Sequence, residues 1–259
     1  MATFLFDKII FGPVKSRRLG VSLGINLLPN DCKLCSFNCI YCECGWNPDH
    51  NEQKINFHPK DQVKESLFEK LSLMKANNED LDVITFAGNG EPTLHPEFSE
   101  IINYTIEVRN QVFPQARIAV LSNSSMIHKK SVFEALNKVD DNILKLDGGT
   151  EETIINLDQP VGKFNLNNTV ELLSKFDGNL IIQTLFIRGE YEGKIIDNTT
   201  KEEIEAWLTH LQKIQPKEVM IYTISRDTPS DNLEKISMEE LQQIAQKVED
   251  AGFKTQISG

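Results

Sequence analysis

Apolar positions recur along the chain with two periods, one typical of amphipathic helices and the other of buried strands. Val63, Leu67, Leu71 and Met74 stand at helical spacing between charged residues. Short, nearly continuous apolar runs such as LIIQTLFI at 180–187 are typical of strands that are covered on both faces. Helices are predicted over about 61–76, from 96 onward, and over 129–138, 165–176, 200–214 and 238–250; strands are predicted over about 21–27, 82–87, 117–121, 142–146, 180–187 and 219–224, with a last short one over 254–257.

This alternation of strands and helices predicts an α/β fold. Because strands that alternate with helices form a parallel sheet with right-handed crossovers, we expect a partial (β/α)6 TIM-like barrel of parallel strands. The length of 259 residues suits one domain. That domain would comprise an N-terminal strap over 1–20, a loop and excursion over 28–58 and the remaining β/α units over 60–259. A site is expected at the carboxyl ends of the strands.

Composition and charge narrow the classes of protein. The chain has 27 Lys and Arg against 38 Asp and Glu, a net charge of −11, which disfavours nucleic acid as a partner without excluding a local basic patch. There is no run of about 18 apolar residues, so no membrane-spanning helix is expected. The first residues, MATFLFDKIIFG, have no basic region before the apolar stretch and no small-residue cleavage site after it. We therefore expect a cytoplasmic protein.

All five cysteines lie within 13 residues, at positions 32, 35, 39, 42 and 44. A disulfide framework spreads its cysteines along the chain to join distant segments, which this cluster cannot do. An odd count also fits poorly with complete pairing. So dense a cluster in an intracellular chain points to metal binding.

Two kinds of metal site fit the cysteine spacing. In the run Cys35-x3-Cys39-x2-Cys42, three thiolates can hold three corners of an iron–sulfur cubane and leave the fourth iron open. Alternatively, four of the five cysteines, or three with His50, can bind a structural zinc ion. The spacing alone leaves both interpretations open.

Two motifs and one longer stretch resemble the radical S-adenosylmethionine (radical SAM) superfamily. The C-x3-C-x2-C run, with Tyr41 before its third cysteine, resembles the signature of that superfamily. The run GNGE at 88–91 is similar to its Gly-Gly-Glu element, with Asn89 in place of the first of the paired glycines or as an insertion. The stretch from Gly12 to Asn26 resembles the branch related to wyosine-base synthases.

The resemblance implies that Cys35, Cys39 and Cys42 hold a 4Fe–4S cluster whose open iron binds the amino and carboxylate groups of S-adenosylmethionine (SAM). One electron, from an external reductant of the flavodoxin or ferredoxin type, would cleave the sulfonium C–S bond. The products are methionine and a 5′-deoxyadenosyl radical, which abstracts hydrogen from an unknown substrate. Residues expected to bind SAM are Tyr41, Gly88, Asn89, Gly90, Glu91, Ser122, Asn123, Lys145, Asp147 and Gln183.

Each expected SAM residue also has a structural interpretation. Glu91 suits the methionine ammonium, but a carboxylate there also caps a helix. Lys145 and Asp147 are two apart on a strand, so both can face inward, where a lysine needs an anion. Gln183 lies in an apolar strand and needs a hydrogen-bond partner, protein or ligand, if it is buried. The glycines can admit a ligand or form an ordinary turn.

Several further residues are candidates for substrate binding or have no assigned chemistry. Arg17, Arg18, Arg188 and Arg226 can bind a substrate or a carboxylate, with surface ion pairs as the alternative for each. Incidental roles are expected for Cys32, Cys44, His50 and His95.

Three classes of function therefore compete. The first is a radical SAM enzyme, acting in wyosine-type tRNA modification, in peptide or protein modification or in glycyl-radical activation. The second is a zinc-stabilised binding module without catalysis. The third is a one-electron carrier that does not use SAM. The net charge of −11 weighs against tRNA within the first class.

Overall fold

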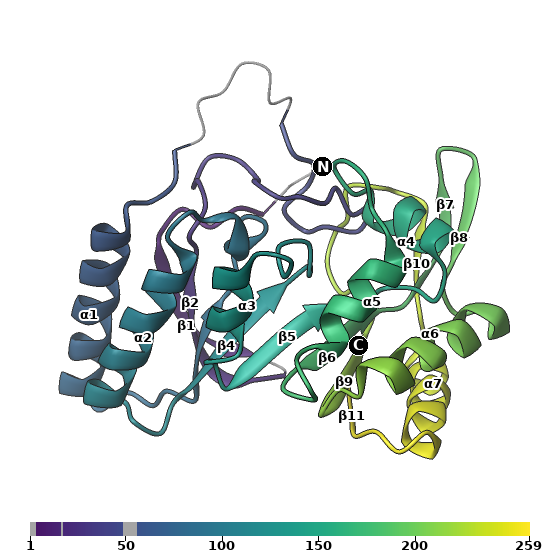
Figure 1. Ribbon diagram of the computed structural model, residues 1–259. Helices are drawn as coiled ribbons and strands as arrows, with labels where there is room; N and C mark the ends of the chain where they lie inside the picture. The colour runs from purple at the N-terminus through teal and green to yellow at the C-terminus, as the bar shows by residue number, and fades with distance from the viewer. Residues whose placement is uncertain (1–3, 17, 49–55) are drawn as a thin grey trace.

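The computed structural model describes residues 4–16, 18–48 and 56–259. Within this part of the chain, an eight-stranded sheet forms the centre of the molecule (Figure 1). Every neighbouring pair in it is parallel except the first, because β1 runs antiparallel to β2. In spatial order the strands are β1 (Ile10–Ser16), β2 (Gly20–Ile25), β3 (Val83–Phe86), β4 (Arg117–Ser122), β5 (Asp141–Lys145), β6 (Ile181–Leu185), β9 (Glu218–Tyr222) and β11 (Thr255–Ser258).

Helices cover the outer face of the curled sheet (Figure 1). Their apolar stripes pack on the outward residues of the strands, such as Ile84, Phe86 and Ile118, and this layer forms the main core. No helix in the described ranges is both long and apolar enough to cross a membrane. The helices are α1 (Lys60–Ala76), α2 (Phe98–Val112), α3 (Lys130–Leu136), α4 (Glu151–Asp158), α5 (Leu166–Ser174), α6 (Lys201–Ile214) and α7 (Met238–Asp250), with a 3-10 turn, η1 (Pro92–Leu94).

The inner face of the sheet changes from apolar to polar along the strands. Near the amino ends, inward side chains form a small apolar cluster of Leu19, Val83, Ala119, Ile143, Ile181 and Met220. Since side chains alternate along a strand, the residues two positions further on also point inward. These include Thr85, Lys145, Gln183 and Tyr222. The curled sheet therefore encloses a lumen with an apolar base and a polar upper part near the carboxyl ends.

The predicted α/β half-barrel is confirmed, and most predicted helices and strands lie within a few residues of their expected positions. The strand predicted over 180–187 is wrong as a single element. β6 ends at Leu185, and the chain then enters an antiparallel sheet of order β10-β7-β8. The Asn198 side chain bonds the backbone of Leu185 and Ile187 there, at 2.6 and 2.8 Å. The strands of this small sheet are β7 (Ile187–Tyr191), β8 (Lys194–Asp197) and β10 (Leu233–Lys235).

Candidate active site

The cysteine loop follows β2 and lies above the carboxyl ends of the parallel strands. Cys39 is buried, while Cys35 and Cys42 are partly buried against the same apolar group as Phe37 and Tyr41. Three donors approach the sulfur atoms: the Phe37 amide at 3.4 Å and the Asn123 amide at 3.5 Å from Cys35 Sγ, and Lys145 Nζ at 3.2 Å from Cys39 Sγ. Donors of this kind stabilise thiolates, which are the form that binds metal.

The acidities of the three thiols reflect burial and mutual proximity. Burial raises the pKa of Cys35 to about 11 and that of Cys39 well above its ordinary value. The charge of Cys42 contributes to the rise at both thiols, and all three cysteines belong to the same apolar group. A hydrogen bond from Cys44 lowers the pKa of Cys42 to about 5. Cationic iron would replace the protons on Cys35 and Cys39, so the donor set suits a thiolate-bound cluster.

Sequence reasoning missed a buried cation beside these thiols. Lys33 is only 2% exposed, and its Nζ donates to the carbonyl of Gly45 at 2.9 Å. The Lys33 ammonium lowers the pKa of both Cys35 and Cys42. Its effect is smaller than that of burial on Cys35 and smaller than that of the Cys44 hydrogen bond on Cys42. Its position between Cys32 and Cys35 in the sequence is the only signal that it lies near the site.

The described cysteines do not form a site for one metal ion. In the ranges that the structure describes, no group of three or more His, Cys, Asp or Glu side chains is arranged to hold a single ion. A cubane has no such requirement, because each thiolate binds a different iron. His50, the remaining candidate for a zinc site, lies outside the described residues.

A backbone bridge joins the cysteine loop to the loop after β3. The Leu34 amide donates to the Asn89 carbonyl at 2.8 Å, and the Glu91 amide donates to the Leu34 carbonyl at 3.0 Å. Gly90 lies between them at φ +135°, and a Cβ there would overlap the Leu34 carbonyl oxygen. A Cβ at Gly88 would likewise overlap the Asn26 side chain. Both glycines are therefore needed for the close packing of two loops, whatever ligand they also meet.

We expect Gly90→Ala to lower the free energy of unfolding of the apoprotein by about 2–4 kcal/mol, because strain at positive φ adds to overlap with a backbone atom. Gly162→Ala is the matched control, since Gly162 has φ +103° but no atom within 4 Å of the added Cβ. The control should lose only about 1–2 kcal/mol. Urea unfolding measures both losses, and equal losses would show that the contact with Leu34 contributes nothing.

The side chains of Asn89 and Glu91 are hydrogen-bonded to other residues of the protein. Asn89 is fully buried, and both protons of its side-chain amide are donated, to the carbonyls of Phe6 at 2.9 Å and Pro29 at 2.8 Å. Glu91 is 2% exposed. Its carboxylate caps η1 by accepting from Thr93, and it also accepts from the backbone amide of Asn123 at 2.6 Å. Burial raises the pKa of Glu91, and these hydrogen bonds oppose the rise. The capping interpretation of Glu91 is thus observed, and its contact with SAM stays a prediction.

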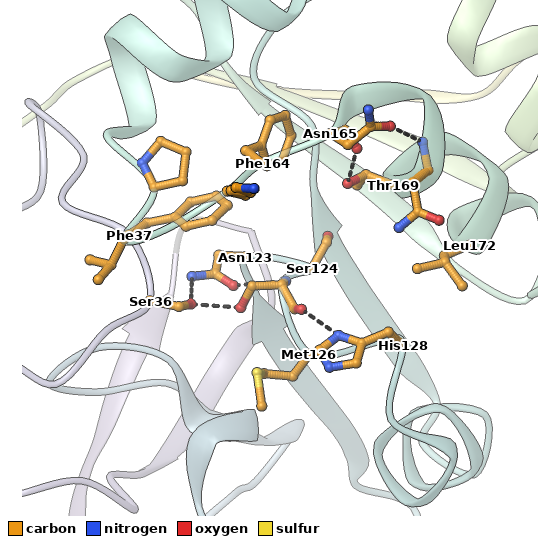
Figure 2. A pocket seen from close by; sticks show the side chains of 15 residues that line it. Ser36, Phe37, Asn123, Ser124, Met126, His128, Phe164, Asn165, Thr169 and Leu172 are labelled. Atoms are coloured by element: carbon orange, nitrogen blue, oxygen red, sulfur yellow. Dashed lines mark hydrogen bonds between the residues drawn. The ribbon is translucent and has the colours of Figure 1, made fainter.

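Ser122 and Asn123 end β4 and turn toward the cysteine loop. The Ser122 hydroxyl accepts from the Ser124 amide at 3.1 Å, a local turn contact. The side-chain amide of Asn123 donates to the Ser36 hydroxyl at 2.8 Å. Figure 2 shows this pair at one side of a cavity of about 330 Å³, with Phe37 and Phe164 beside it. Asn123 therefore connects the end of β4 directly to the loop that carries Cys35.

A buried ionic network lies beneath Cys39. Lys145 Nζ is 3.4 Å from Asp147 Oδ2 and 3.2 Å from Asp158 Oδ1, and it also contacts the Tyr41 hydroxyl. Tyr41 in turn donates to Asp147 and, at 3.2 Å, to Asp158. Burial lowers the pKa of Lys145, but Asp158, Cys39 and Asp147 outweigh burial and raise it well above its ordinary value. Burial raises the pKa of Asp147 to about 6.

This network confirms that Lys145 faces inward, and it includes one residue, Asp158, that was not predicted. Lys145 does face inward and does meet anions, but the anions are protein carboxylates. Asp158 was missed because α4, which carries it, was not predicted. A threonine cap followed by two glutamates, Thr150-Glu151-Glu152, was the available signal for that helix. Gln183 is 5% exposed, and its contact with SAM stays a prediction.

The remaining candidates divide into paired and unpaired groups. Arg188 is held by Glu240 and Asp197, and Arg226 by Glu43, so both form the expected ion pairs. Arg18 forms no ion pair with a described residue, and Arg17 lies outside the described residues. The Cys44 sulfur lies 3.5 Å from the Gly88 carbonyl oxygen. His95 occupies a turn, where its Nε2 contacts the His58 carbonyl at 2.8 Å.

Comparison with known proteins identifies the class. The model of the radical SAM superfamily matches residues 30–197. The chain is 31% identical over 242 residues to a protein of Brachyspira hyodysenteriae named GTPase Obg, covering 92% of this chain and 33% of that protein. It is 31% identical over 223 residues to a UPF0026 protein of Methanocaldococcus jannaschii, covering 83% of this chain and 63% of the relative. A UPF0026 protein of Helicobacter pylori is 30% identical, with 90% and 71% covered.

Solved structures share the fold at low identity. A radical SAM methyltransferase from Sphaerobacter thermophilus aligns with a TM-score of 0.66 and 12% identity, covering 92% of this chain and 65% of the other. Streptococcus suis SuiB bound to S-adenosylmethionine gives 0.63 and 16%, covering 91% and 50%. TYW1 with a lysine-pyruvate adduct gives 0.62 and 14%, covering 88% and 73%.

The half-barrel and the cysteine loop on its carboxyl rim thus define a class of iron–sulfur proteins that act on SAM. The chain belongs to the radical SAM superfamily, whose members use a 4Fe–4S cluster and SAM, and that prediction is confirmed. It spans 33% and 63% of the length of the first two relatives. Neither Gly-Lys pair in the sequence is followed by Ser or Thr, so the phosphate-binding motif of P-loop GTPases is missing from it.

Proposed function

We propose that this chain is a radical SAM enzyme in which Cys35, Cys39 and Cys42 hold a 4Fe–4S cluster. The observation that carries the proposal is the convergence of these thiols, with thiolate-stabilising donors, above the polar end of the lumen. When bound, the cluster supplies the electron that cleaves SAM into methionine and a 5′-deoxyadenosyl radical, which takes hydrogen from the substrate.

The chain's own residues orient the ligands and exclude water. Asn123 and Lys145 donate to Cys35 and Cys39 and fix the two sulfur atoms. Glu91, held between η1 and the end of β4, presents a buried carboxylate beside the bridge to the cysteine loop and would accept the SAM ammonium. Asp158, Cys39 and Asp147 keep Lys145 protonated, which preserves a positive charge for the SAM carboxylate or for the thiolates.

The substrate is not shared among the structural neighbours. One neighbour is named a methyltransferase, SuiB is also described bound to the precursor peptide SuiA, and TYW1 carries a lysine-pyruvate adduct. The net charge of −11 favours a small molecule, peptide or protein over tRNA. The electron is expected from a flavodoxin- or ferredoxin-type reductant.

Reductive cleavage tests the proposed function. The protein reconstituted with iron and sulfide and reduced with dithionite should convert SAM to methionine and 5′-deoxyadenosine, measured by chromatography. A protein that contains the full cluster and binds SAM, yet releases no 5′-deoxyadenosine with several reductants, would instead be an electron carrier.

Glu91→Gln should weaken SAM binding by roughly 10- to 150-fold without loss of iron, because one charge-assisted hydrogen bond contributes about 1.5–3 kcal/mol. Titration calorimetry and iron analysis measure the two effects. Thr93→Ala is the control, since it removes a hydroxyl that donates to Glu91 but keeps the carboxylate. If Thr93→Ala weakens SAM binding equally, Glu91 acts only by organising the loop.

A further inference from the structure

A second cavity, of about 320 Å³, extends from the surface beside the cysteine loop into the lumen. Its wall includes Cys42 and Tyr41 from the cysteine loop and Leu121, Leu185 and Tyr222 from the carboxyl halves of three strands. Arg18 also lines it, although Arg18 belongs to the turn between β1 and β2, at the amino end of the parallel strands. One cavity therefore joins a predicted cluster ligand to a cation that comes from the base of the barrel.

Arg18 differs from the other arginines that the structure describes. Arg109, Arg117, Arg188 and Arg226 each form an ion pair with an aspartate or glutamate. Arg18 forms none, and its Nη1 atom is buried without any hydrogen-bond partner. Arg18 as a whole is partly exposed, but a buried guanidinium nitrogen without a partner is costly, so its place in a cavity wall indicates a missing anion.

The position of Arg18 is fixed from two sides. Its carbonyl accepts from Gln256 Nε2 at 3.0 Å, which ties the turn to β11. Its guanidinium lies over the Tyr222 ring, 4.8 Å from the ring centre. A stacked guanidinium keeps its planar fork of donors free at the edge, and this fork matches a carboxylate or a phosphate.

The other charged side chains that line the cavity or lie beside it do not supply that anion. Glu43 lies at the mouth and pairs with Arg226 at 2.6 Å. Asp147 and Asp158 pair with Lys145 instead. Cys42 would be bound to iron in the loaded protein, and the other polar lining residues, which include Thr223, Thr228 and Ser258, carry no charge.

We propose that this cavity binds the anionic end of the substrate, a carboxylate or phosphate group, with Arg18 as its anchor. This proposal rests on the proposed function, because it is the cluster at Cys42 that makes the cavity a reaction site. With its anionic group bound at Arg18, the rest of the substrate would lie in the same cavity, on the side toward Cys42. The substrate class is thus a small acidic molecule, or a larger one with an acidic end that enters the lumen.

Anion binding to the cluster-loaded full chain tests the proposal, with succinate and inorganic phosphate as probes. Calorimetry should show that at least one probe binds, and that Arg18→Gln weakens its binding roughly 10-fold or more. Arg18→Lys keeps the charge but loses the fork, so it should bind with intermediate affinity. Arg226→Gln is the matched control: the same residue type, in the same cavity, but 64% exposed and already paired. It should bind like the wild type.

Chemical modification of the wild type gives a second readout that needs no variant. The bound probe should slow the reaction of phenylglyoxal with Arg18, followed by mass spectrometry, and leave the rate at Arg226 unchanged. Failure of both probes to bind, equal loss in Arg226→Gln, or protection of Arg226 instead of Arg18 would each overturn the proposal.

SAM binding and cleavage are measured on the same preparations, because SAM also carries a carboxylate. Unchanged SAM affinity in Arg18→Gln supports a substrate anion, whereas a parallel fall in SAM affinity assigns Arg18 to SAM and overturns the proposal. If the wild type binds the probe through Arg18 but never cleaves SAM, the proposed function fails and the anion site stands.

Discussion

Replacing any one of Cys35, Cys39 and Cys42 with alanine is expected to abolish the cluster and, with it, 5′-deoxyadenosine formation. With one thiolate lost, two remain to hold the cubane, and the open iron that would bind SAM is no longer unique. Iron and acid-labile sulfide after anaerobic reconstitution measure the first effect. Chromatography of the SAM reaction measures the second.

Cys32→Ala and Cys44→Ala are the matched controls, since both lie in the same loop. Both variants should keep their iron, although Cys44→Ala removes the hydrogen bond that lowers the pKa of Cys42. Loss of iron from either control, together with retention in one of the three central variants, would show that a different triplet holds the cluster.

Lys145→Met is expected to lower the free energy of unfolding of the apoprotein by about 3–5 kcal/mol. The substitution leaves two carboxylates, Asp147 and Asp158, uncompensated in a site where both are almost fully buried. Lys175→Met is the comparison, because its pair with Glu171 is 55% and 62% exposed and contributes about 0–1 kcal/mol. Urea unfolding of both variants measures the difference.

A second substitution tests the cause of this loss. Adding Asp158→Asn to Lys145→Met removes one of the two uncompensated carboxylates. The double variant should therefore lose less unfolding free energy than the sum of the losses in the two single variants. If the losses simply add, the ionic network does not account for the effect of Lys145→Met, and lost packing does.

The main sheet could be predicted because its strands are short, nearly continuous apolar runs. Such runs are typical of strands that are covered on both faces. The sequence could not show where the run at 180–187 divides, since the division depends on Asn198, which is distant in sequence. The helix α4 was missed because its eight residues give little more than two turns of periodicity. β1 was missed because Gly12 and Pro13 interrupt a short edge strand.

The site followed from the sequence as far as strand ends could predict it. Parallel strands bring their carboxyl ends to one rim, so Glu91, Asn123 and Asp147 were placed there from their positions alone. Arg18 was a candidate without a location, because it enters the lumen from the amino end, where that rule gives no information. The ion pairs that occupy Arg188 and Arg226 also depend on contacts that only the folded chain reveals.

The backbone bridge between Leu34 and the Gly90 loop has a consequence for cofactor loading. The two hydrogen bonds of Leu34 connect the loop that bears the cysteines to the loop that bears Glu91, so ordering one favours order in the other. Such coupling between two binding events is thermodynamically reciprocal. Whatever factor the iron–sulfur cluster adds to SAM affinity through this connection, SAM must add to cluster retention. SAM should therefore protect the iron from chelators, and Gly90→Ala should reduce that protection.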